Sequence, residues 1–485
     1  MFCAYFTISI FRFLTLTPTS WDLGIYTEYV KQLSLLRAPI VDVRGPGFDL
    51  LGDHFQVGLA VLAPFFRLYP SPATLLFFQA LLTAASVFPI MSAGTLLLGR
   101  ASGRLIGLAY GCSWGLQQMI DFDFHEIALA VPLLACSLSA LVRGRPRAAA
   151  LWALPLVFVK EDQGFTVAAI GAYLIFEGVW TSSRPVPRPG SAPLRSSAVW
   201  GALLVVWGLF WSVFAITVII PHFNPLHEYY YWKDGGVVAG GHGFSVGSLV
   251  AQTATGWPTK LQTVILLLLP TAFAALGSPI ALLALPSLLL RFVSTNTAYW
   301  GTDWHYNATI MPILFIAAVA ALARWRAVDA VDAVGAGGPR AGLRRVGLRR
   351  VGDGLRAGLA RHGAPMMAAI AVALAFQFPL STLWHGSTYA ISPQVAADNA
   401  AMAVVPDGAT VQTTLNMLAT LAARTDTFWI GNAGNPLTTY IVFDGKNSGY
   451  TPAPANVPAF IAGLYPAAGY TQVFERSDVY VFRRR

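Results

Sequence analysis

The sequence predicts a mainly α-helical protein: a polytopic transmembrane helix bundle of about eleven spans, followed by a small outward-facing C-terminal α/β domain. The 485 residues are 55% hydrophobic and only 11% charged, which is too apolar for a soluble protein and typical of a chain that crosses a membrane many times. Apolar runs of span length recur between residues 73 and 384. After residue 386 the chain becomes polar, as expected for a domain outside the membrane.

The N-terminal region begins with an apolar stretch, Met1 to Leu16, that is shorter than the roughly 20 residues of a full span. We expect it to be a first transmembrane helix that is completed by residues upstream of Met1. A polar outer loop follows over 18–55, and its apolar spacing predicts a short amphipathic helix at the surface over 25–36. Residues 54–68 predict a re-entrant or interfacial helix. Full spans are then expected at 73–99, 104–119, 126–142, 147–160, 164–180, 198–220, 258–273, 277–293, 306–323 and 364–384.

Arginine is concentrated in alternate linkers between these spans, which predicts the orientation of the chain. Cytoplasmic loops of membrane proteins carry an excess of Lys and Arg. The arginine-rich linkers contain residues 100–104, 143–147, 184–195 and 324–363. We expect the last of them, rich in Gly and Arg, to be disordered or loosely membrane-bound. The protein is thus predicted to lie in the plasma (inner) membrane, with a transmembrane domain over 1–385 and an extracytoplasmic domain over 386–485.

The extracytoplasmic domain has the pattern of a small α/β fold. Short β-rich runs predict strands near 409–411, 439–443 and 477–482, and residues 412–423 predict a helix between the first two. A length of about 100 residues is normal for an independent domain.

The other linkers must face outward, and they carry most of the acids and imidazoles. A charged side chain in hydrocarbon costs several kcal/mol unless it is paired or hydrated. We therefore predict one outward polar cavity, formed by Asp22, Asp123, His125, Glu126 and Lys160. Further polar side chains on the same side are Asp53, His54, Asp121, Glu161, Asp162, Asp303 and His305, with an aromatic loop over 222–242.

Several of these residues fit two interpretations. Asp22 suits a general base that accepts a proton from an acceptor hydroxyl, or an N-cap of the helix that follows. Asp53 likewise suits a helix cap, while His54 suits contact with a phosphate or a sugar. Asp121 and Asp123 suit a divalent cation such as Mg²⁺ or Mn²⁺, with or without His125. The alternative is a helix break in which Asp123 caps the next span.

The cationic and aromatic residues also leave two interpretations open. Lys160 suits a phosphate oxygen, positioned by Glu161 or Asp162, or a simple ion pair with Glu161. Arg291, at the end of an apolar span, suits a lipid phosphate or snorkelling to the interface. The aromatic loop suits sugar rings or an interfacial aromatic belt. Asp303 and His305 repeat this polar and aromatic pattern at another outward end.

Several classes of function lack their motifs. Cys3, Cys112 and Cys136 lie in apolar runs without metal-ligand spacing, which predicts neither a zinc site nor a disulfide framework. The sequence has no Walker loop, dinucleotide-binding fingerprint or Gly-x-Ser-x-Gly elbow. It also has no basic-aromatic surface for RNA or DNA, so we expect no nucleic-acid partner.

Four motifs resemble a family of bacterial membrane proteins. Trp21-Asp22-Leu23-Gly24-Ile25, Gly52-Asp53-His54-Phe55, Asp123-Phe124-His125-Glu126 and Lys160-Glu161-Asp162 resemble, in order and spacing, domain of unknown function 2079. That family in turn looks like the glycosyltransferase C superfamily, whose members carry an acidic residue in a large first outer loop. The resemblance puts Asp22 at the catalytic acidic position and residues 121–126 at the second acidic outer loop.

The resemblance implies a membrane glycosyltransferase. The donor would be a polyprenyl-phosphate-linked sugar, and the acceptor a hydroxyl of a cell-envelope glycan, lipid or protein. Asp22, Asp123, His125 and Glu126 would be catalytic, while Asp53, His54, Lys160, Glu161, Asp162, Arg291, Asp303 and His305 would bind substrate. The alternatives are a lipid or small-molecule transporter or flippase and a non-catalytic membrane scaffold. Inverted repeats with broken helices, typical of transporters, are not evident in the sequence.

Overall fold

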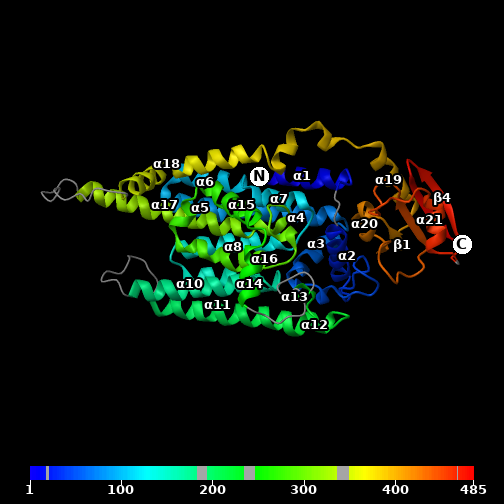
Figure 1. Ribbon diagram of the computed structural model, residues 1–485, viewed down its shortest axis with the longest axis horizontal. Helices are drawn as coiled ribbons and strands as arrows, with labels where there is room; N and C mark the ends of the chain where they lie inside the picture. Colours follow the sequence, from blue (N-terminus) through cyan, green and yellow to red (C-terminus); the bar gives the residue numbers. More distant parts are fainter. Residues whose placement is uncertain (18–20, 183–193, 234–245, 336–348, 467) are drawn as a thin grey trace.

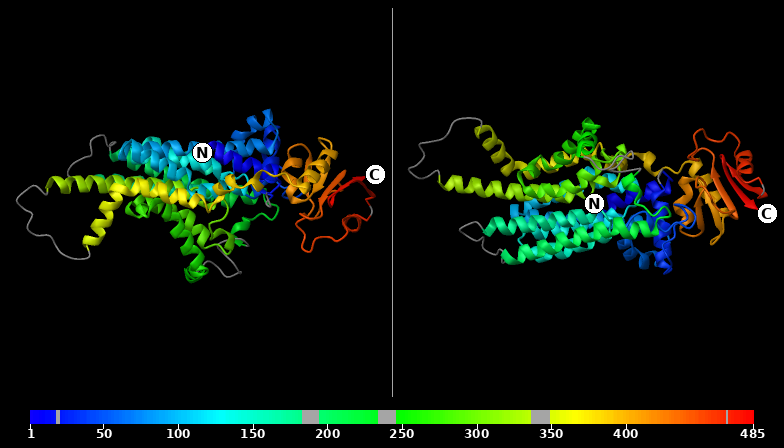
Figure 2. Two further views of the ribbon diagram at one scale, coloured as in Figure 1. Left: turned by 90° about the horizontal axis from the view of Figure 1, so that it is seen from above. Right: turned by 60° about the horizontal axis from the view of Figure 1, so that its bottom comes forward.

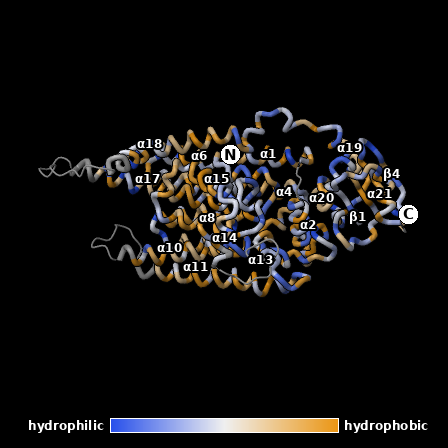
Figure 3. The backbone as a smooth tube through the Cα atoms, viewed as in Figure 1, coloured by the Kyte–Doolittle hydropathy of each residue, from blue (hydrophilic) through white to orange (hydrophobic). Residues whose placement is uncertain are grey.

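The computed structural model describes residues 1–17, 21–182, 194–233, 246–335, 349–466 and 468–485. The molecule is elongated: a body of long helices occupies one end, and a small sheet with its own helices projects from the other (Figure 1; Figure 2). Hydrophobic residues dominate the helices of the body, whereas hydrophilic residues gather in the connections and around the sheet (Figure 3). The predicted division into a helical membrane region and a C-terminal sheet domain is therefore present.

The helices of the body run mostly along the long axis of the molecule (Figure 1). Their bounds are α1 Phe2–Leu14, α2 Asp22–Ser34, α3 Ala63–Leu68, α4 Pro72–Ala85, α5 Val87–Leu98, α6 Arg100–Gly111, α7 Trp114–Phe122, α8 Ile127–Val142, α9 Pro146–Ala153, α10 Gln163–Ser182, α11 Leu194–Phe214, α12 Ile220–Phe223, α13 Tyr230–Lys233, α14 Val246–Ala254, α15 Trp257–Leu268, α16 Leu285–Phe292, α17 Ile310–Gly335 and α18 Arg349–Ala375. Short 3₁₀ turns join several of them, among them η1 Leu50–Gly52, η2 Val57–Leu62, η3 Leu154–Phe158, η8 Thr297–Tyr299 and η9 His305–Asn307.

Within the described residues, four helices are long and apolar enough to cross a membrane: Pro72–Leu98, Ser197–Phe223, His305–Ala330 and Gly354–Ala375. Shorter apolar helices accompany them, so the count of about eleven spans stays a prediction. Several predicted continuous spans are broken, for example the following two. The run 104–119 is divided between α6 and α7, and the run 147–160 changes from α9 to a 3₁₀ turn at Pro155, which lacks the N–H for an α-helical bond.

Glycines bring α10 and α11 into backbone contact. A Cβ atom on Gly171 would lie 2.5 Å from the carbonyl oxygen of Gly201, and one on Gly208 would lie 2.3 Å from the carbonyl oxygen of Gly164. Small residues allow such close approach between membrane helices. This packing fixes the first turn of α10, which carries part of the candidate site.

The arginine-rich linker at 324–363 is more ordered than predicted. α17 continues to Gly335 and α18 begins at Arg349, so the prediction of disorder is wrong for both ends, while 336–348 lies outside the described residues. Arg326 explains part of this order, because Nε donates to the carbonyl of Ala360 at 2.6 Å and Nη1 to that of Leu98 at 2.8 Å. These helix ends lie at the opposite end of the molecule from the sheet (Figure 1).

The C-terminal sheet has five strands in the order β2-β1-β3-β5-β4. β1 pairs in parallel with β2 and β3, whereas β5 is antiparallel to both β3 and β4. The strands predicted from the sequence correspond to β1, β3 and β5, and the predicted helix corresponds to α20; β2 and β4 were not predicted. The bounds are β1 Thr410–Thr413, β2 Asp426–Trp429, β3 Tyr440–Asp444, β4 Tyr470–Arg476 and β5 Val479–Arg484, with helices α19 Pro393–Val404, α20 Leu415–Ala422 and α21 Val457–Leu464.

The sheet domain rests on α2 and on Trp21 before it. Nζ of Lys31 in α2 donates to the carbonyl oxygens of Ala422 and Thr425 at the end of α20, at 2.7 and 2.8 Å. The rings of Trp21 and Trp429 meet edge to face, with centroids 5.0 Å apart. The amphipathic helix predicted over 25–36 is therefore α2, but it is covered by the sheet domain instead of lying open at a surface.

The segment predicted as a re-entrant or interfacial helix over 54–68 begins later, at Val57. It consists of η2 followed by α3. Val61, Phe65 and Leu68 on its outer side are exposed, as expected for a helix at a membrane interface.

Candidate functional site

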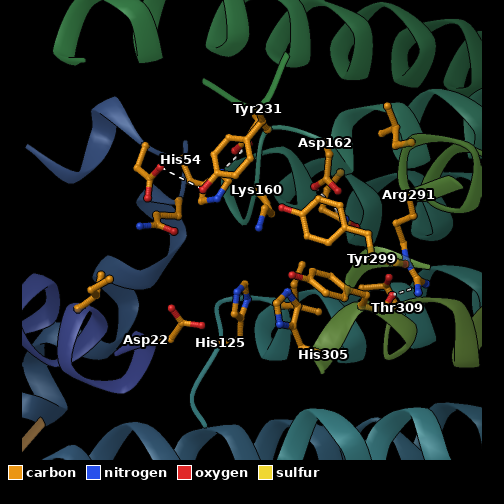
Figure 4. Close-up of a pocket in the computed structure, with 18 of the residues that line it drawn as sticks. Asp22, His54, His125, Lys160, Asp162, Tyr231, Arg291, Tyr299, His305 and Thr309 are labelled. Atoms are coloured by element: carbon orange, nitrogen blue, oxygen red, sulfur yellow. Dashed lines mark hydrogen bonds and ion pairs between the residues drawn. The ribbon is translucent and has the colours of Figure 1, made fainter. Parts of the chain in front are cut away.

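A cavity of about 350 Å³ lies where the segment from α2 to η1, the start of α10 and the segment from α16 to α17 meet. Its lining is both charged and aromatic, and Figure 4 shows the side chains that point into it. Most of the predicted site residues line this cavity: Asp22, Asp53, His54, His125, Lys160, Glu161, Asp162, Arg291 and His305.

Asp22 is the first residue of α2, and its carboxylate faces His125 within the cavity (Figure 4). The N-cap position belongs to Trp21, which makes no side-chain capping bond. The interpretation of Asp22 as a helix cap is therefore wrong. Burial raises the pKa of Asp22, an effect that His125 and Lys160 partly oppose. A carboxylate with a raised pKa is a stronger base than an exposed one.

Glu126 is the centre of a buried charge cluster behind the cavity wall. Its side chain is 0% exposed; Oε1 lies 3.0 Å from Nζ of Lys160, and Oε2 lies 2.6 Å from Nδ1 of His125. The hydroxyl of Tyr26 also donates to Oε2. Burial alone would raise the pKa of Glu126, but His125 and Lys160 hold it well below its usual range. Glu126 is therefore an anion that positions its neighbours from outside the cavity.

Lys160 and His125 owe their orientation to this anion. Burial would lower the pKa of Lys160, but Glu126, Glu161 and Asp162 raise it above its ordinary value, so the amine stays charged. Burial lowers the pKa of His125, although Glu126 opposes the shift. Nδ1 of His125 lies 2.6 Å from Oε2 of Glu126, and this contact orients the imidazole ring. The His125 ring also stacks on His305, with centroids 3.3 Å apart.

Glu161 joins two of the sequence motifs. Its Oε1 lies 2.7 Å from Nδ1 of His54, and its Oε2 accepts a hydrogen bond from the backbone N–H of Phe55 at 3.0 Å. The hydroxyl of Tyr229 donates to Oε1 at 2.9 Å. Burial would raise the pKa of Glu161, but His54 lowers it to about 2. The expected ion pair between Lys160 and Glu161 is thus wrong, because each residue has a different principal partner.

Asp53 and His54 lie beside an aromatic wall. Asp53 follows η1, and the next helical residue is Val57, so Asp53 does not cap the helix as one interpretation expected. Oδ1 of Asp53 accepts a hydrogen bond from the hydroxyl of Tyr231 at 3.1 Å, and Oδ2 lies 3.6 Å from Nε of Arg44. The rings of His54 and Tyr231 stack, with centroids 4.5 Å apart.

Arg291 is turned inward and holds a loop. It is only 6% exposed, so it does not snorkel to an interface. Four of its N–H groups donate to protein oxygens, so its contact with a lipid phosphate stays a prediction. The acceptors are the carbonyl oxygens of Tyr299, Tyr306 and Gly301 and Oδ1 of Asn307, at 2.8, 3.3, 3.0 and 2.8 Å.

The prediction that Glu126 lines the cavity is wrong, and three further predicted residues also lie outside it: Asp121, Asp123 and Asp303. Asp303 is exposed. Asp121 forms an ion pair with Arg12 at 3.1 Å, and Asp121 and Asp123 border a separate small space. The prediction that Asp123 faces the cavity is wrong because Gln79 of α4 turns the loop: it donates to the carbonyl of Asp123 and accepts from the N–H of His125 at 2.9 Å. Asp123 also does not cap α8, because Glu126 occupies that position.

The cation site at Asp121 and Asp123 stays a prediction. In the part of the chain that the structure describes, no three His, Cys, Asp or Glu side chains are grouped as metal ligands. The predicted aromatic loop over 222–242 contributes Tyr229 and Tyr231 to the cavity, while residues 234–242 lie outside the described residues.

Sequence reasoning missed several residues of this site. Tyr26 lies one helical turn after Asp22, a spacing that puts both on one side of α2. Gln56 and Gln163 directly follow two of the motifs and line the cavity. Both glutamines lie next to recognised motifs, but an uncharged amide in such a position does not by itself indicate a binding site.

The family described as predicted membrane protein, domain of unknown function 2079, matches residues 12–438. The chain belongs to this family. No curated protein sequence matches it. Among solved structures, it is similar to ArnT from Cupriavidus metallidurans bound to undecaprenyl phosphate, with a TM-score of 0.52 and 13% identity over 99% of this chain and 96% of that chain. ArnT from the same organism in the apo state gives a TM-score of 0.49 and 14% identity over 95% and 92%. The family member described here thus shares the fold of ArnT.

Proposed function

We propose that this protein is a membrane glycosyltransferase that moves a sugar from a polyprenyl-phosphate donor to a hydroxyl acceptor outside the cytoplasm. One observation carries the proposal: the Asp22 carboxylate and the Lys160 ammonium group line the same cavity of about 350 Å³. A base and a phosphate-binding cation are the two groups that such a transfer requires. The shared fold supports the same conclusion, since the ArnT structure holds undecaprenyl phosphate.

In this proposal Asp22 and Lys160 act at opposite ends of the reacting bond. Asp22 accepts the proton of the acceptor hydroxyl as its oxygen attacks the anomeric carbon of the sugar. The bond from that carbon to the phosphate oxygen breaks, and polyprenyl phosphate leaves. Nζ of Lys160 lies 3.0 Å from Oε1 of Glu126, and an ammonium group has three N–H donors, which suits the developing phosphate charge. His125 supplies a further hydrogen bond from the same wall.

The proposed topology follows from the arginine distribution. Residues 1–385 form the transmembrane domain, with about eleven spans, and 386–485 form the extracytoplasmic domain. The ends of α17 and α18 at the Gly/Arg-rich linker lie far from the sheet (Figure 1), and the positive-inside rule assigns that end to the cytoplasm. The cavity then opens outside, where the acceptor is found.

Transfer in detergent solution tests the reaction class. We expect the purified full-length protein to release undecaprenyl phosphate from undecaprenyl-phosphate-linked glucose, mannose or arabinose when membrane extracts of the native cells supply the acceptor. A transporter, flippase or scaffold forms no new glycosidic bond, and detergent removes the two compartments that transport requires. Sugar-bearing lipid that stays intact with all three donors would contradict the proposal.

A further inference from the structure

Two glutamines in the cavity carry amide oxygens that lack a hydrogen-bond partner within the described part of the chain. Gln56 is 1% exposed and Gln163 is 2% exposed, and both line the cavity. Neither Oε1 atom has a hydrogen-bond partner among the residues that the structure describes. Nδ1 of His305, in the same lining, also lacks one within those residues. A buried polar atom without a hydrogen-bond partner is destabilising, so several such atoms in one cavity require an explanation.

The two glutamines belong to a rigid wall. Gln56 follows Phe55, whose N–H is held by Glu161, and Gln163 lies two residues after Glu161. The backbone that carries each glutamine is therefore held close to the buried carboxylate of Glu161. Gln163 also begins α10, where Gly164 packs against α11. Side chains on such a fixed frame are preorganised for a ligand.

The amide of Gln163 has a defined direction. Its Nε2 donates to Oδ1 of Asp162 at 3.1 Å. Because the amide group is planar, Oε1 must point away from that carboxylate. The oxygen can then accept a hydrogen bond from a ligand, and the adjacent Asp162 lines the same cavity.

The remaining lining matches a polyhydroxylated ring. The tyrosines Tyr229, Tyr231, Tyr299 and Tyr306 line the cavity, and aromatic faces pack against the C–H faces of sugars. An amide oxygen accepts hydrogen bonds but cannot pair with a phosphate, which presents acceptors of its own. The glutamines therefore suit the hydroxyl groups of a donor better than its phosphate.

We propose that Gln56 and Gln163 form the subsite for the sugar of the donor lipid, with each Oε1 accepting a hydrogen bond from a sugar hydroxyl. Gln163 lies three residues after Lys160 on the same segment, so neighbouring parts of one wall would bind the phosphate and the sugar. This inference rests on the proposed glycosyl transfer and adds the residues that recognise the sugar.

Paired lipids separate the sugar contribution from the phosphate contribution. The full-length protein in detergent is tested for binding undecaprenyl phosphate and the same lipid carrying glucose, mannose or arabinose. We expect the wild type to bind at least one sugar-bearing lipid more tightly than undecaprenyl phosphate. Gln56→Met and Gln163→Met should each reduce that gain about tenfold, the size of one hydrogen bond, without changing the affinity for undecaprenyl phosphate. Gln472→Met, on the exposed strand β4, is the matched control.

Thermal unfolding distinguishes ligand recognition from a structural role. Removing a polar atom that the chain leaves unsatisfied should keep or raise the melting temperature, whereas removing one bonded to a buried water should lower it. The subsite would be overturned if both variants kept the full preference for sugar-bearing lipid over undecaprenyl phosphate. It would also be overturned if the variants melted well below the control. Either result would leave the proposed function intact. A wild type that fails to bind undecaprenyl phosphate itself would instead contradict the proposed function, and the subsite with it.

Discussion

Oε1 of Glu126 lies 3.0 Å from Nζ of Lys160, and this buried ion pair connects two motifs that lie on different loops. The pair fixes the ammonium group at the cavity wall while Glu126 itself stays behind the wall. Because the same carboxylate also contacts His125 and Tyr26, one buried anion determines the geometry of several side chains. The proposed phosphate-binding side of the site depends on it.

Replacing Glu126 should destabilise the protein strongly. Glu126→Gln keeps the shape of the side chain but removes the carboxylate that forms the ion pair with Lys160. Breaking a buried ion pair in this way costs about 3–5 kcal/mol. Thermal unfolding in detergent should show the loss as a lower melting temperature.

A double variant provides the control for this effect. Glu126→Gln together with Lys160→Met removes both charges, so stability should recover in part. If the double variant were as unstable as the sum of the two single variants, the two residues would not be energetically coupled.

The contact between the sheet domain and α2 should depend on Lys31. Its ammonium group donates two hydrogen bonds to carbonyl oxygens at the end of α20, and hydrogen bonds from charged groups contribute about 1.5–3 kcal/mol each. Lys31→Met should therefore reduce the protection of α20 and β2 in hydrogen exchange. Lys446→Met, which removes an exposed lysine from the same domain, should leave that protection unchanged. Equal exchange in the two variants would show that Lys31 does not hold the domain.

The sheet domain should lose stability as the pH rises. Burial, together with Asp444 at the end of β3, raises the pKa of Asp398 to about 8. The folded chain therefore holds a proton that the unfolded chain releases near pH 4. Stability is then highest below about pH 4 for this group and falls as the pH rises toward 8.

Asp398→Asn should remove most of this dependence. Melting temperatures at pH 5 and pH 8 should lie closer together in the variant than in the wild type. A smaller dependence should remain, because burial also raises the pKa of Glu28 to about 8. An unaltered difference between the two melting temperatures would rule out Asp398 as the titrating group.

Cysteine labelling in intact cells should confirm the orientation. In a background without the three natural cysteines, a membrane-impermeant maleimide should react with Lys446→Cys in the sheet domain and not with Arg145→Cys in the linker before α9. Both positions are exposed, so access to the reagent depends on the side of the membrane. Labelling of both positions, or only of 145, would overturn the proposed topology.

The side of the molecule that carries the site could be predicted from the sequence, but its pairings could not. The positive-inside rule uses only the order of the arginine-rich linkers along the chain, and this order was enough to place Asp22, His125 and Lys160 on the same side. Which carboxylate meets Lys160 depends on how the loops pack, and the neighbour in sequence, Glu161, was the wrong choice.

The orientation of the loop at 121–126 shows why sequence alone was insufficient. Gln79 on the distant helix α4 bonds to the backbone at Asp123 and His125, turning one side chain away from the cavity and the other toward it. Nothing in the local sequence distinguishes these two residues. Strand β4 was missed for a related reason: it is mostly exposed at a sheet edge and shows no regular alternation of buried residues.

The Asp22 carboxylate is the group on which the account depends. Because burial raises its pKa, the basic form is lost as the pH falls through that raised value, and transfer should decline with it. Asn at this position keeps the shape of the side chain but cannot accept the proton.

The most direct test compares transfer by Asp22→Asn with transfer by Asp303→Asn, since Asp303 is an exposed carboxylate outside the cavity. Both purified variants are given sugar-bearing undecaprenyl phosphate and the native acceptor extract, and the rate of glycosidic bond formation is measured. We predict that Asp22→Asn folds and binds undecaprenyl phosphate normally but transfers sugar at least about a hundredfold more slowly, whereas Asp303→Asn matches the wild type. Transfer by Asp22→Asn at the wild-type rate would contradict the proposed role of Asp22 as the base.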